Sequence, residues 1–522
     1  MYKSTLLATY PLQAFRTITQ NLFMLYISYL SNLYFDKEED DNMETKKILI
    51  HGSWKESSSD DCLDIINPST GMLVTRIPKC NKNDVDQAVQ SASVGFNIWK
   101  NTSSEDRAKI MHKAAGLIRE NSNKIANEIS SEMGKPSKSA LGEVLGAATL
   151  FDFFAEEGLR LKGDIYLRNY SDEQVQVLKE PIGIVAGITA ANYPVALLTW
   201  KLGAALAAGC SFVAKPDVQA TSAALSIGEI FLKAGLPNGV FNIVAGDGTT
   251  GSLLVKHSLI SKVAVTGSVE TGSKVAALAA RDGKRITLEL GGQCPAIITE
   301  GIDPRKIIKE FISQTFNNSG QYCYGIHRAY VHSSIYDSFI DVLVENVKKL
   351  KVGVADDPSV DLGPLYRESI YNNVMKHIED AIAKGARVLC GGRRLESPTN
   401  TYFVEPTVLD NVSGDMLISK EETFGPVLAV IKVDSLSEAI EYANNTMYGL
   451  ASFVYTSDAG LGLQAARQLE SGVVWVNKIH KAYDYAPFGG FKRSGMGREK
   501  SSYGLDEYLE LKTIYLTLPT ID

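Results

Sequence analysis

From residue 182 onward, short apolar segments alternate with longer segments of helical periodicity, and this alternation restricts the fold more than any other feature of the chain. The pattern predicts strands over residues 182–188, 211–215, 240–244 and 263–266, and helices over residues 195–208 and 221–234. Strands that alternate with helices form a parallel sheet covered by the helices. A second alternating set over residues 295–480 predicts another lobe of the same kind, so the expected fold class is α/β.

The composition narrows the class of function. The chain has 522 residues, enough for two or three domains, and a formal net charge of -7. No basic run with interleaved aromatic residues occurs, so we expect no nucleic-acid partner. The six cysteines are scattered without the paired spacing of zinc ligands. We therefore expect no metal site, and a reducing cytoplasm is the expected location.

The first residues differ from the rest of the chain. Residues 22–31 are apolar and follow Lys3 and Arg16, which is the pattern of a signal peptide or a membrane anchor. The apolar run is shorter than the ~20 residues that a membrane-spanning helix needs. We therefore expect residues 1–45 to form a disordered extension without a membrane partner, and a membrane anchor within residues 1–42 is the alternative.

Two residues suggest covalent chemistry on a carbonyl group. Cys323 lies in a glycine-containing segment, and Glu289 precedes two glycines. Each alone has an ordinary explanation, since a cysteine packs like a small apolar residue and a carboxylate is usually solvated or ion-paired. Together they match a reaction in which a thiolate attacks a carbonyl carbon and a carboxylate activates the water that releases the product.

One segment has the pattern of a phosphate-binding turn. Residues 263–272 predict a strand, a turn at Gly267 and Ser268, and a helix that contains Gly272. Backbone N–H groups at such a helix start bind a pyrophosphate, although a tight turn without a ligand has the same pattern. Lys215 ends another predicted strand, where it is either a ribose or 2′-phosphate contact or a solvated lysine.

Two further segments carry candidate contacts. Asn192 follows the strand over residues 182–188, and a side-chain amide there is able to donate to an oxyanion. Glu422 and Phe424 precede a predicted strand, where the carboxylate would hold a ribose and the ring would flank it. The alternatives are a helix cap for the first segment and a polar turn for the second.

In this order and at these separations, the segments resemble the aldehyde dehydrogenase superfamily from about residue 46 to residue 518. The most specific parts are LELGG (288–292), GQYC (320–323), EETFGPV (421–427) and PFGGFKRSGMGRE (487–499). The resemblance implies a Rossmann-like cofactor domain, an α/β catalytic domain and a small β element that bridges subunits.

The resemblance also implies a role for each candidate residue. Cys323 is the implied nucleophile, Glu289 the general base, and Asn192 the oxyanion donor. The implied cofactor contacts are Lys215 and Glu422 for ribose, the turn with Gly267, Ser268 and Gly272 for the pyrophosphate, and Phe424 beside the nicotinamide ribose. The implied reaction passes through a thiohemiacetal and a thioester, which water hydrolyses.

The implied domain boundaries follow the same match. They are residues 46–160 with 182–291 for the dinucleotide, residues 292–495 for catalysis, and residues 161–181 with 505–522 for oligomerisation. A terminal β segment without a partner would leave an exposed edge, so we expect a homodimer or a homotetramer.

Three positions depart from the family pattern. Ala191 stands where tryptophan is usual, and Gln293 replaces a lysine. Val218 replaces a glutamate, three residues after Lys215, that binds both ribose hydroxyls in NAD-using members. Without this carboxylate a 2′-phosphate is not repelled, so NADP is the expected cofactor. NAD is the alternative, which Asp217 beside Val218 would favour.

The expected function is NAD(P)-dependent oxidation of a small polar aldehyde, such as glyceraldehyde or lactaldehyde, to a carboxylate. Lys478, His480 or Lys481 would meet a substrate hydroxyl or carboxylate, or else lie in a solvated loop. The alternatives are oxidation of succinate semialdehyde or an aromatic aldehyde, a CoA-acylating dehydrogenase, and a structural member without activity. Retention of Cys323 and Glu289 argues against the last two.

Overall fold

The computed structural model describes residues 43–166, 173–396, 401–480 and 483–517. The chain separates into two units, Met1–Thr45 and Lys46–Asp522, and the sheets belong to the second. The first 42 residues of the predicted extension, which include the alternative membrane anchor, lie outside the described residues, whereas residues 43–45 are described and Thr45 forms a β-bridge. Within the described ranges, no helix is both long enough and apolar enough to cross a bilayer.

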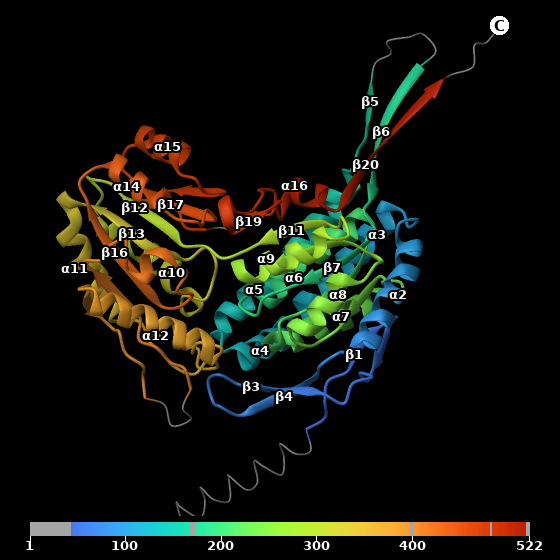
Figure 1. The fold of residues 1–522 in the computed structure, drawn as a ribbon, viewed down its shortest axis with the longest axis horizontal. Coiled ribbons are helices and arrows are strands. Elements are labelled where there is room, and N and C mark those ends of the chain that lie inside the picture. The colour runs from blue at the N-terminus through green and yellow to red at the C-terminus, as the bar shows by residue number, and fades with distance from the viewer. Residues whose placement is uncertain (1–42, 167–172, 397–400, 481–482, 518–522) are drawn as a thin grey trace, which may run out of the picture. The chain divides into compact units, whose positions relative to one another are not determined.

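The largest sheet is built around parallel strands (Figure 1). Its order across the described residues is β19 (Gly495–Met496), β11 (Arg285–Glu289), β10 (Ile260–Thr266), β7 (Ile184–Ile188), β8 (Ser211–Lys215), β9 (Phe241–Ile243), β1 (Ile48–Ile50) and β2 (Ser53–Lys55). The strands from β11 to β9 run parallel, and the outer strands pair antiparallel. The strand predicted over residues 211–215 is confirmed with the same bounds.

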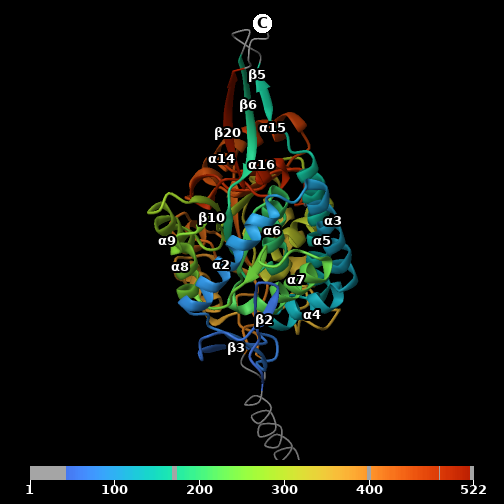
Figure 2. The same ribbon diagram turned by 90° about the vertical axis from the view of Figure 1, so that its right-hand side faces the viewer.

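Helices cover both faces of this sheet (Figures 1 and 2). One face packs against α3 (Ser104–Glu120), α4 (Ser122–Met133), α5 (Ser137–Leu159), α6 (Pro194–Ala208) and α7 (Thr221–Ala234), and the other against α2 (Lys82–Trp99), α8 (Gly248–Lys256) and α9 (Val269–Ala280). On β8, Phe212 and Ala214 join the first core and Val213 joins the second. Successive side chains of a strand point to opposite faces, so an apolar run such as β8 needs cover on both sides.

The strand order reverses beside β7. The chain adds β8 and β9 on one side of β7, and then crosses to add β10 and β11 on the other side. In open α/β sheets, ligands bind outside the carboxyl ends of the strands at such a reversal. The loops after β7 and β10 therefore border the expected binding crevice.

The second sheet is also mainly parallel, which confirms the α/β class for both lobes. Its order is β14 (Arg387–Cys390), β15 (Thr407–Asp410), β16 (Val427–Val433), β13 (Ile326–His332), β12 (Cys294–Ile298), β17 (Ala451–Tyr455) and β18 (Val473–Val476). Its helices are α10 (Pro304–Phe316), α11 (Tyr336–Val347), α12 (Glu368–Ala383), α13 (Leu417–Lys420), α14 (Leu436–Asn444) and α15 (Ala459–Gln468). A separate hairpin consists of β3 (Cys62–Ile66) and β4 (Leu73–Pro78).

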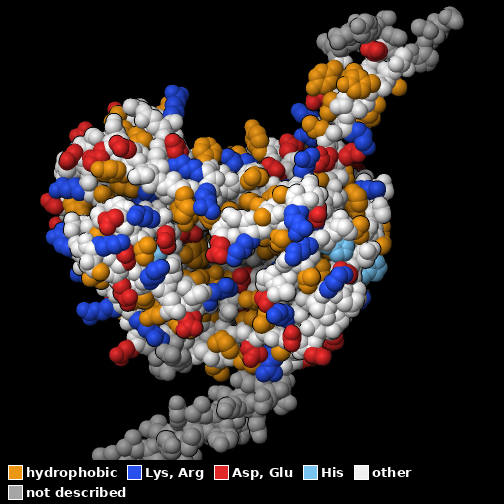
Figure 3. All heavy atoms as spheres, viewed as in Figure 1, with side chains coloured by type: hydrophobic (Ala, Val, Ile, Leu, Met, Phe, Trp, Pro, Cys, Tyr) orange, Lys and Arg blue, Asp and Glu red, His pale blue; other side chains and the backbone are white. Residues whose placement is uncertain are grey.

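A three-stranded antiparallel sheet projects from the second unit (Figure 1). It consists of β5 (Asp164–Tyr166), β6 (Glu173–Pro181) and β20 (Leu509–Thr517), and α16 (Ser501–Asp506) precedes β20. Apolar side chains gather on it in Figure 3, among them Leu511 and Tyr515, which are 69% and 80% exposed. The sheet therefore presents apolar side chains and two strand edges to its surroundings.

Candidate active site

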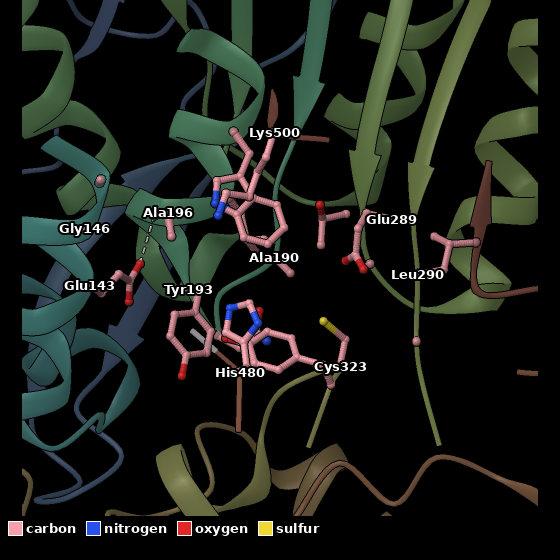
Figure 4. A pocket seen from close by; sticks show the side chains of 18 of the residues that line it. Glu143, Gly146, Ala190, Tyr193, Ala196, Glu289, Leu290, Cys323, His480 and Lys500 are labelled. Carbon is pink, nitrogen blue, oxygen red and sulfur yellow. Dashed lines mark hydrogen bonds between the residues drawn. The ribbon is translucent and has the colours of Figure 1, made fainter. Parts of the chain in front are cut away.

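A cavity of about 720 Å³ opens at the carboxyl ends of β7 and β10, where the strand order reverses (Figure 4). The first lobe contributes Ala190, Asn192, Gly267, Ser268 and Glu289 to its lining, and the second lobe contributes Cys323, Tyr324, Glu422, Phe424 and His480. The cavity therefore brings together the predicted nucleophile, the predicted base and the predicted oxyanion donor.

The segment before Cys323 has a strained backbone. Asn318 and Ser319 have φ angles of 50° and 56°, and that of Gly320 is 70°. Such conformations cost about 1–3 kcal/mol for each non-glycine residue and persist where the surroundings hold them. The Ser319 hydroxyl supplies one such contact, because it donates to the carbonyl of Gly363 at 2.7 Å. The loop directs the sulfur of Cys323 into the cavity (Figure 4).

Burial raises the pKa of both reactive groups. Glu289 is 1% exposed, and neither of its carboxyl oxygens hydrogen-bonds to a described residue. Burial, followed by the charge of Glu499, raises the pKa of Glu289 well above its usual range. Burial, followed by the charge of Glu289, raises the pKa of the Cys323 thiol in the same way. The cavity therefore holds the thiol of Cys323 and the carboxyl group of Glu289, each with a raised pKa.

Asn192 is tied to the loop that carries the thiol. Its Nδ2 donates to the carbonyl of Gln321 at 3.1 Å, and Nδ2 of Asn318 donates to the carbonyl of Asn192 at 3.3 Å. Helix α6 begins directly afterwards at Pro194, whose fixed φ suits a first helical turn. A side-chain amide has two N–H donors, so one donor of Asn192 remains for an oxyanion.

A buried ion pair lies behind Glu289, and our sequence analysis missed it. Lys201 on α6 pairs with Glu499, and Nζ of Lys201 also donates to the hydroxyl of Thr266 at 2.6 Å. Lys201 favours the charged form of Glu289, while Glu499 opposes it. Glu499 belongs to a recognised motif and could have been found. Lys201 lies in an apolar helix without such a signal.

A second buried ion pair supports one wall of the cavity. Lys135 pairs with Glu143 on α5, and both side chains are fully buried. The Glu143 carboxylate also accepts from the backbone N–H groups of Val195 and Ala196, at 2.9 and 3.1 Å. These lie in the first turn of α6, where negative charge is stabilising. Lys135 Nζ lies 3.5 Å from the ring centre of Tyr193, which therefore has a fixed position on the wall (Figure 4).

The predicted pyrophosphate turn faces the cavity. Ser268 caps α9 by accepting from the backbone N–H of Thr271 at 3.1 Å, and Gly267 precedes it. Glu422 accepts from the backbone N–H of Gly292 at 3.1 Å, and burial raises the pKa of its carboxyl to about 7. A helix start and a buried carboxyl group at strand ends suit the phosphates and the ribose of a dinucleotide.

Two predicted cofactor residues lie outside the cavity lining. Lys215 is 7% exposed at the end of β8, where its Nζ donates to the carbonyl of Pro216 at 3.0 Å and burial lowers its pKa. Gly272 faces the core, since a Cβ there would lie 2.4 Å from the side chain of Leu290. The absence of a side chain at Gly272 therefore permits α9 to pack closely against Leu290. Among the described residues, no cluster of three or more His, Cys, Asp or Glu side chains is placed to hold a metal ion.

The carboxylate of Asp217, the residue before Val218, forms an ion pair. Asp217 Oδ1 accepts from Nη2 of Arg367 at 2.6 Å, and this guanidinium lies 4.7 Å from the ring centre of Tyr366. Asp217 comes two residues after Lys215 in the sequence. Its carboxylate was expected to favour NAD, and the Arg367 guanidinium of the second lobe neutralises it.

The three candidate substrate contacts, Lys478, His480 and Lys481, differ in their position relative to the cavity. His480 lines the cavity with its ring 4.4 Å from that of Tyr324, and burial lowers its pKa to about 3, so it is neutral. Lys478 contacts Tyr483 outside the lining, and Lys481 lies outside the described residues. The cation that does line the cavity is Lys500, which our sequence analysis did not single out.

A doubly wound sheet whose strand reversal opens on a cavity lined by a thiol and a carboxyl group is suited to an enzyme that binds a dinucleotide. A sequence model of the aldehyde dehydrogenase family matches residues 54–514, and the chain belongs to that family. The predicted resemblance is thus confirmed, and the protein is an enzyme that oxidises aldehydes.

The names of similar proteins specify different substrates and cofactors. The succinate-semialdehyde dehydrogenase [NADP(+)] GabD of Escherichia coli (strain K12) is 38% identical over 92% of this chain and 100% of its own. The 3-sulfolactaldehyde dehydrogenase of Pseudomonas putida is 37% identical over 92% of this chain and 98% of its own. A betaine aldehyde dehydrogenase from Staphylococcus aureus, solved in complex with NAD+, is 32% identical with a TM-score of 0.88, over 91% of this chain and 95% of its own.

Proposed function

We propose that the protein oxidises a small polar aldehyde, such as glyceraldehyde or lactaldehyde, to the carboxylate with NAD(P)+. The convergence of Cys323, Glu289 and Asn192 on one cavity carries this proposal. Membership of the aldehyde dehydrogenase family supports the reacting group, and the name of the 3-sulfolactaldehyde relative supports a small polar substrate.

The first half of the proposed reaction is covalent capture. The Cys323 thiol releases its proton to solvent water, Sγ then bonds to the aldehyde carbon, and the carbonyl oxygen becomes an oxyanion. The free N–H donor of Asn192 and the backbone N–H of Cys323 stabilise this charge. The oxidised nicotinamide supplies the hydride acceptor. Loss of hydride from the thiohemiacetal carbon leaves a thioester on Cys323.

The second half is hydrolysis. Glu289, as a carboxylate, takes a proton from water, whose oxygen attacks the thioester carbon and expels the thiolate of Cys323. The raised pKa of Glu289 makes it a stronger base near neutral pH than an exposed carboxylate. Its place in the cavity favours water over CoA as the acyl acceptor.

For the cofactor we propose NADP as the preferred dinucleotide and NAD as the weaker alternative. Gly267 and Ser268 would bind the pyrophosphate, and Phe424 and Glu422 would lie beside the nicotinamide ribose. Lys215 would meet the ribose that carries the 2′-phosphate. Val218 places no charge there and Arg367 engages Asp217, so little remains to repel a phosphate. The name of the Escherichia coli relative specifies NADP(+).

Oxidation of an anionic semialdehyde is the second candidate, because relatives with 36–38% identity carry succinate- or glutarate-semialdehyde names. A carboxylate substrate needs a cation that is free to pair with it. Lys500 is the one lysine or arginine among the described lining residues, and it is paired with Asp484 at 3.2 Å. This pairing favours an uncharged polar substrate.

We further propose that the protein forms a homodimer or homotetramer and is located in the cytoplasm. We also propose that each chain has the domain boundaries given in the sequence analysis. The exposed apolar residues and open edges of the β5–β6–β20 sheet support subunit association.

The test is a substrate and cofactor panel with the purified full chain. Glyceraldehyde, lactaldehyde, succinate semialdehyde and benzaldehyde are assayed for NAD(P)H formation with each dinucleotide, with and without CoA. We expect the hydroxyaldehydes with NADP to give the highest kcat/KM, independent of CoA. A CoA requirement, or no oxidation of any aldehyde, contradicts the proposal.

A further inference from the structure

The substrate side of the cavity ends at a pair of charged side chains that no recognised motif contains. Lys500 Nζ lies 3.2 Å from Oδ1 of Asp484, and both residues line the cavity. Lys500 is 2% exposed, so the ammonium group is removed from bulk water. In Figure 4, Lys500 lies at the top of the cavity, and His480 and Cys323 lie next to each other below it.

Aromatic side chains connect this pair to the reacting thiol. Lys500 Nζ lies 5.7 Å from the ring centre of Trp200, and its charge acts on His480. The His480 ring lies 4.4 Å from that of Tyr324, the neighbour of Cys323 in the chain. A substrate with its aldehyde carbon at Cys323 would therefore extend between aromatic walls toward Lys500.

The backbone at Lys500 is strained. Its φ and ψ angles are 62° and 175°, a combination that is essentially confined to glycine, and the φ angle of Ser501 is 55°. The loop is held by a second contact with the same partner residue, since the backbone N–H of Ser501 donates to the carbonyl of Asp484 at 2.8 Å. Strain of this kind persists where surrounding contacts hold it, and it clusters at ligand sites.

Resting on the proposed aldehyde oxidation, we propose that Lys500 and Asp484 recognise a hydroxyl group on the carbon chain of an uncharged hydroxyaldehyde. A hydroxyl both donates and accepts, so it bonds to the Asp484 carboxylate and the Lys500 ammonium at once. A carboxylate only accepts, and Asp484 repels it. A plain alkyl chain offers neither charged group a new partner.

Other charges at the cavity leave this distinction intact. Glu143 is paired with Lys135, and His480 is neutral. Glu422 accepts from the backbone N–H of Gly292. Among the described lining residues, no arginine is present to bind an anion in place of Lys500. The pair therefore decides the charge and polarity that the substrate chain must have.

The test compares substrates that differ only in hydroxyls or charge. kcat/KM is measured for glyceraldehyde, propanal and succinate semialdehyde with saturating NADP, in the unmodified protein and in Lys500→Met and Asp484→Asn. Lys349→Met is the matched control, because this lysine is 63% exposed and pairs with Glu345 one helical turn away. Ratios between substrates within one variant cancel losses of folded protein.

We expect the unmodified protein and the control to prefer glyceraldehyde to propanal by at least tenfold. Lys500→Met should lose at least tenfold in that ratio. Asp484→Asn removes the carboxylate that pairs with Lys500. In this variant the ratio of kcat/KM for succinate semialdehyde to kcat/KM for glyceraldehyde should rise at least fivefold. A glyceraldehyde-to-propanal ratio that stays within twofold in Lys500→Met overturns the inference. Selective loss of succinate-semialdehyde oxidation in that variant also overturns it, since the lysine would then bind a carboxylate.

These results separate the inference from the proposed function. If the unmodified protein oxidises none of the three aldehydes, the proposed function fails. If it oxidises them and the ratios do not respond to Lys500 and Asp484, only the assignment of the hydroxyl site fails.

Discussion

The two sides of the cavity are built differently. The expected pyrophosphate contacts Gly267 and Ser268 directly follow the regular strand β10, although Phe424, the expected neighbour of the nicotinamide ribose, has a φ angle of 54°. The substrate side consists of loops with strained backbone, including Ser319 before Cys323 and Lys500 before α16. The position of the pyrophosphate turn thus follows from the sheet, whereas the loops that carry Cys323 and Lys500 depend on tertiary contacts that hold unusual conformations.

Replacement of Cys323 should have the largest effect, because it removes the reacting atom from the strained side. We expect Cys323→Ala to lose aldehyde oxidation by roughly 10³-fold or more, measured as NAD(P)H formation. Cys294→Ser is the matched control, since Cys294 is buried and its thiol faces the Cys323 carbonyl. The control should keep activity within about tenfold. Oxidation by Cys323→Ala at the normal rate would remove this residue from the mechanism.

Replacement of Glu289, which lies at the end of strand β11, should have the next largest effect. Glu289→Gln keeps the shape of the side chain but removes the proposed base, so the thioester should form and then hydrolyse slowly. We expect a burst of NAD(P)H close to one equivalent per site, followed by a steady rate lowered roughly 10²–10⁴-fold. Rapid-mixing kinetics distinguish the two phases. An unchanged steady rate would show that another group activates the water.

Arg367 tests whether the second lobe influences the cofactor side. Arg367→Ala frees the Asp217 carboxylate near the expected 2′-phosphate position, so the NADP-to-NAD ratio of kcat/KM should fall about tenfold. The double variant Arg367→Ala with Asp217→Asn should restore most of the ratio. A single variant that leaves the ratio unchanged would place the ion pair outside cofactor selection.

The smallest expected effect concerns the pH dependence of thiol alkylation in the protein without cofactor. The charged form of Glu289 raises the pKa of Cys323, after burial as the main cause. Glu289→Gln should therefore move the rise in iodoacetamide reactivity at Cys323 toward lower pH. A shift toward higher pH would reverse the sign of this coupling.

The sequence predicted the regular parts of the molecule well. The strand β8 and the helix α7 have the predicted bounds, because their apolar periodicity and flanking turn residues reflect burial directly. Cys323, Glu289 and Asn192 were found through motifs, and the structure places them in one cavity. Lys215 and Gly272 were found in the same way, but they lie outside its lining.

The charged pairs around the cavity could not be predicted in this way. Lys201 and Glu499 are 298 positions apart, and no local pattern connects them. Lys500 adopts a conformation typical of glycine without being one, so turn chemistry gives no signal. Asp217 was expected to favour NAD, but its partner Arg367 lies 150 positions away. Such pairs depend on how distant segments pack, which local periodicity does not encode.

Trapping the acyl-enzyme tests the central claim most directly. Glu289→Gln is mixed with glyceraldehyde and NADP, quenched in acid during the burst, digested, and analysed by mass spectrometry. The account predicts one glyceroyl group on the peptide that contains Cys323, at nearly one per subunit, and none when NADP is omitted. An acyl group on another residue, or NADPH formed without any acylated peptide, would contradict it.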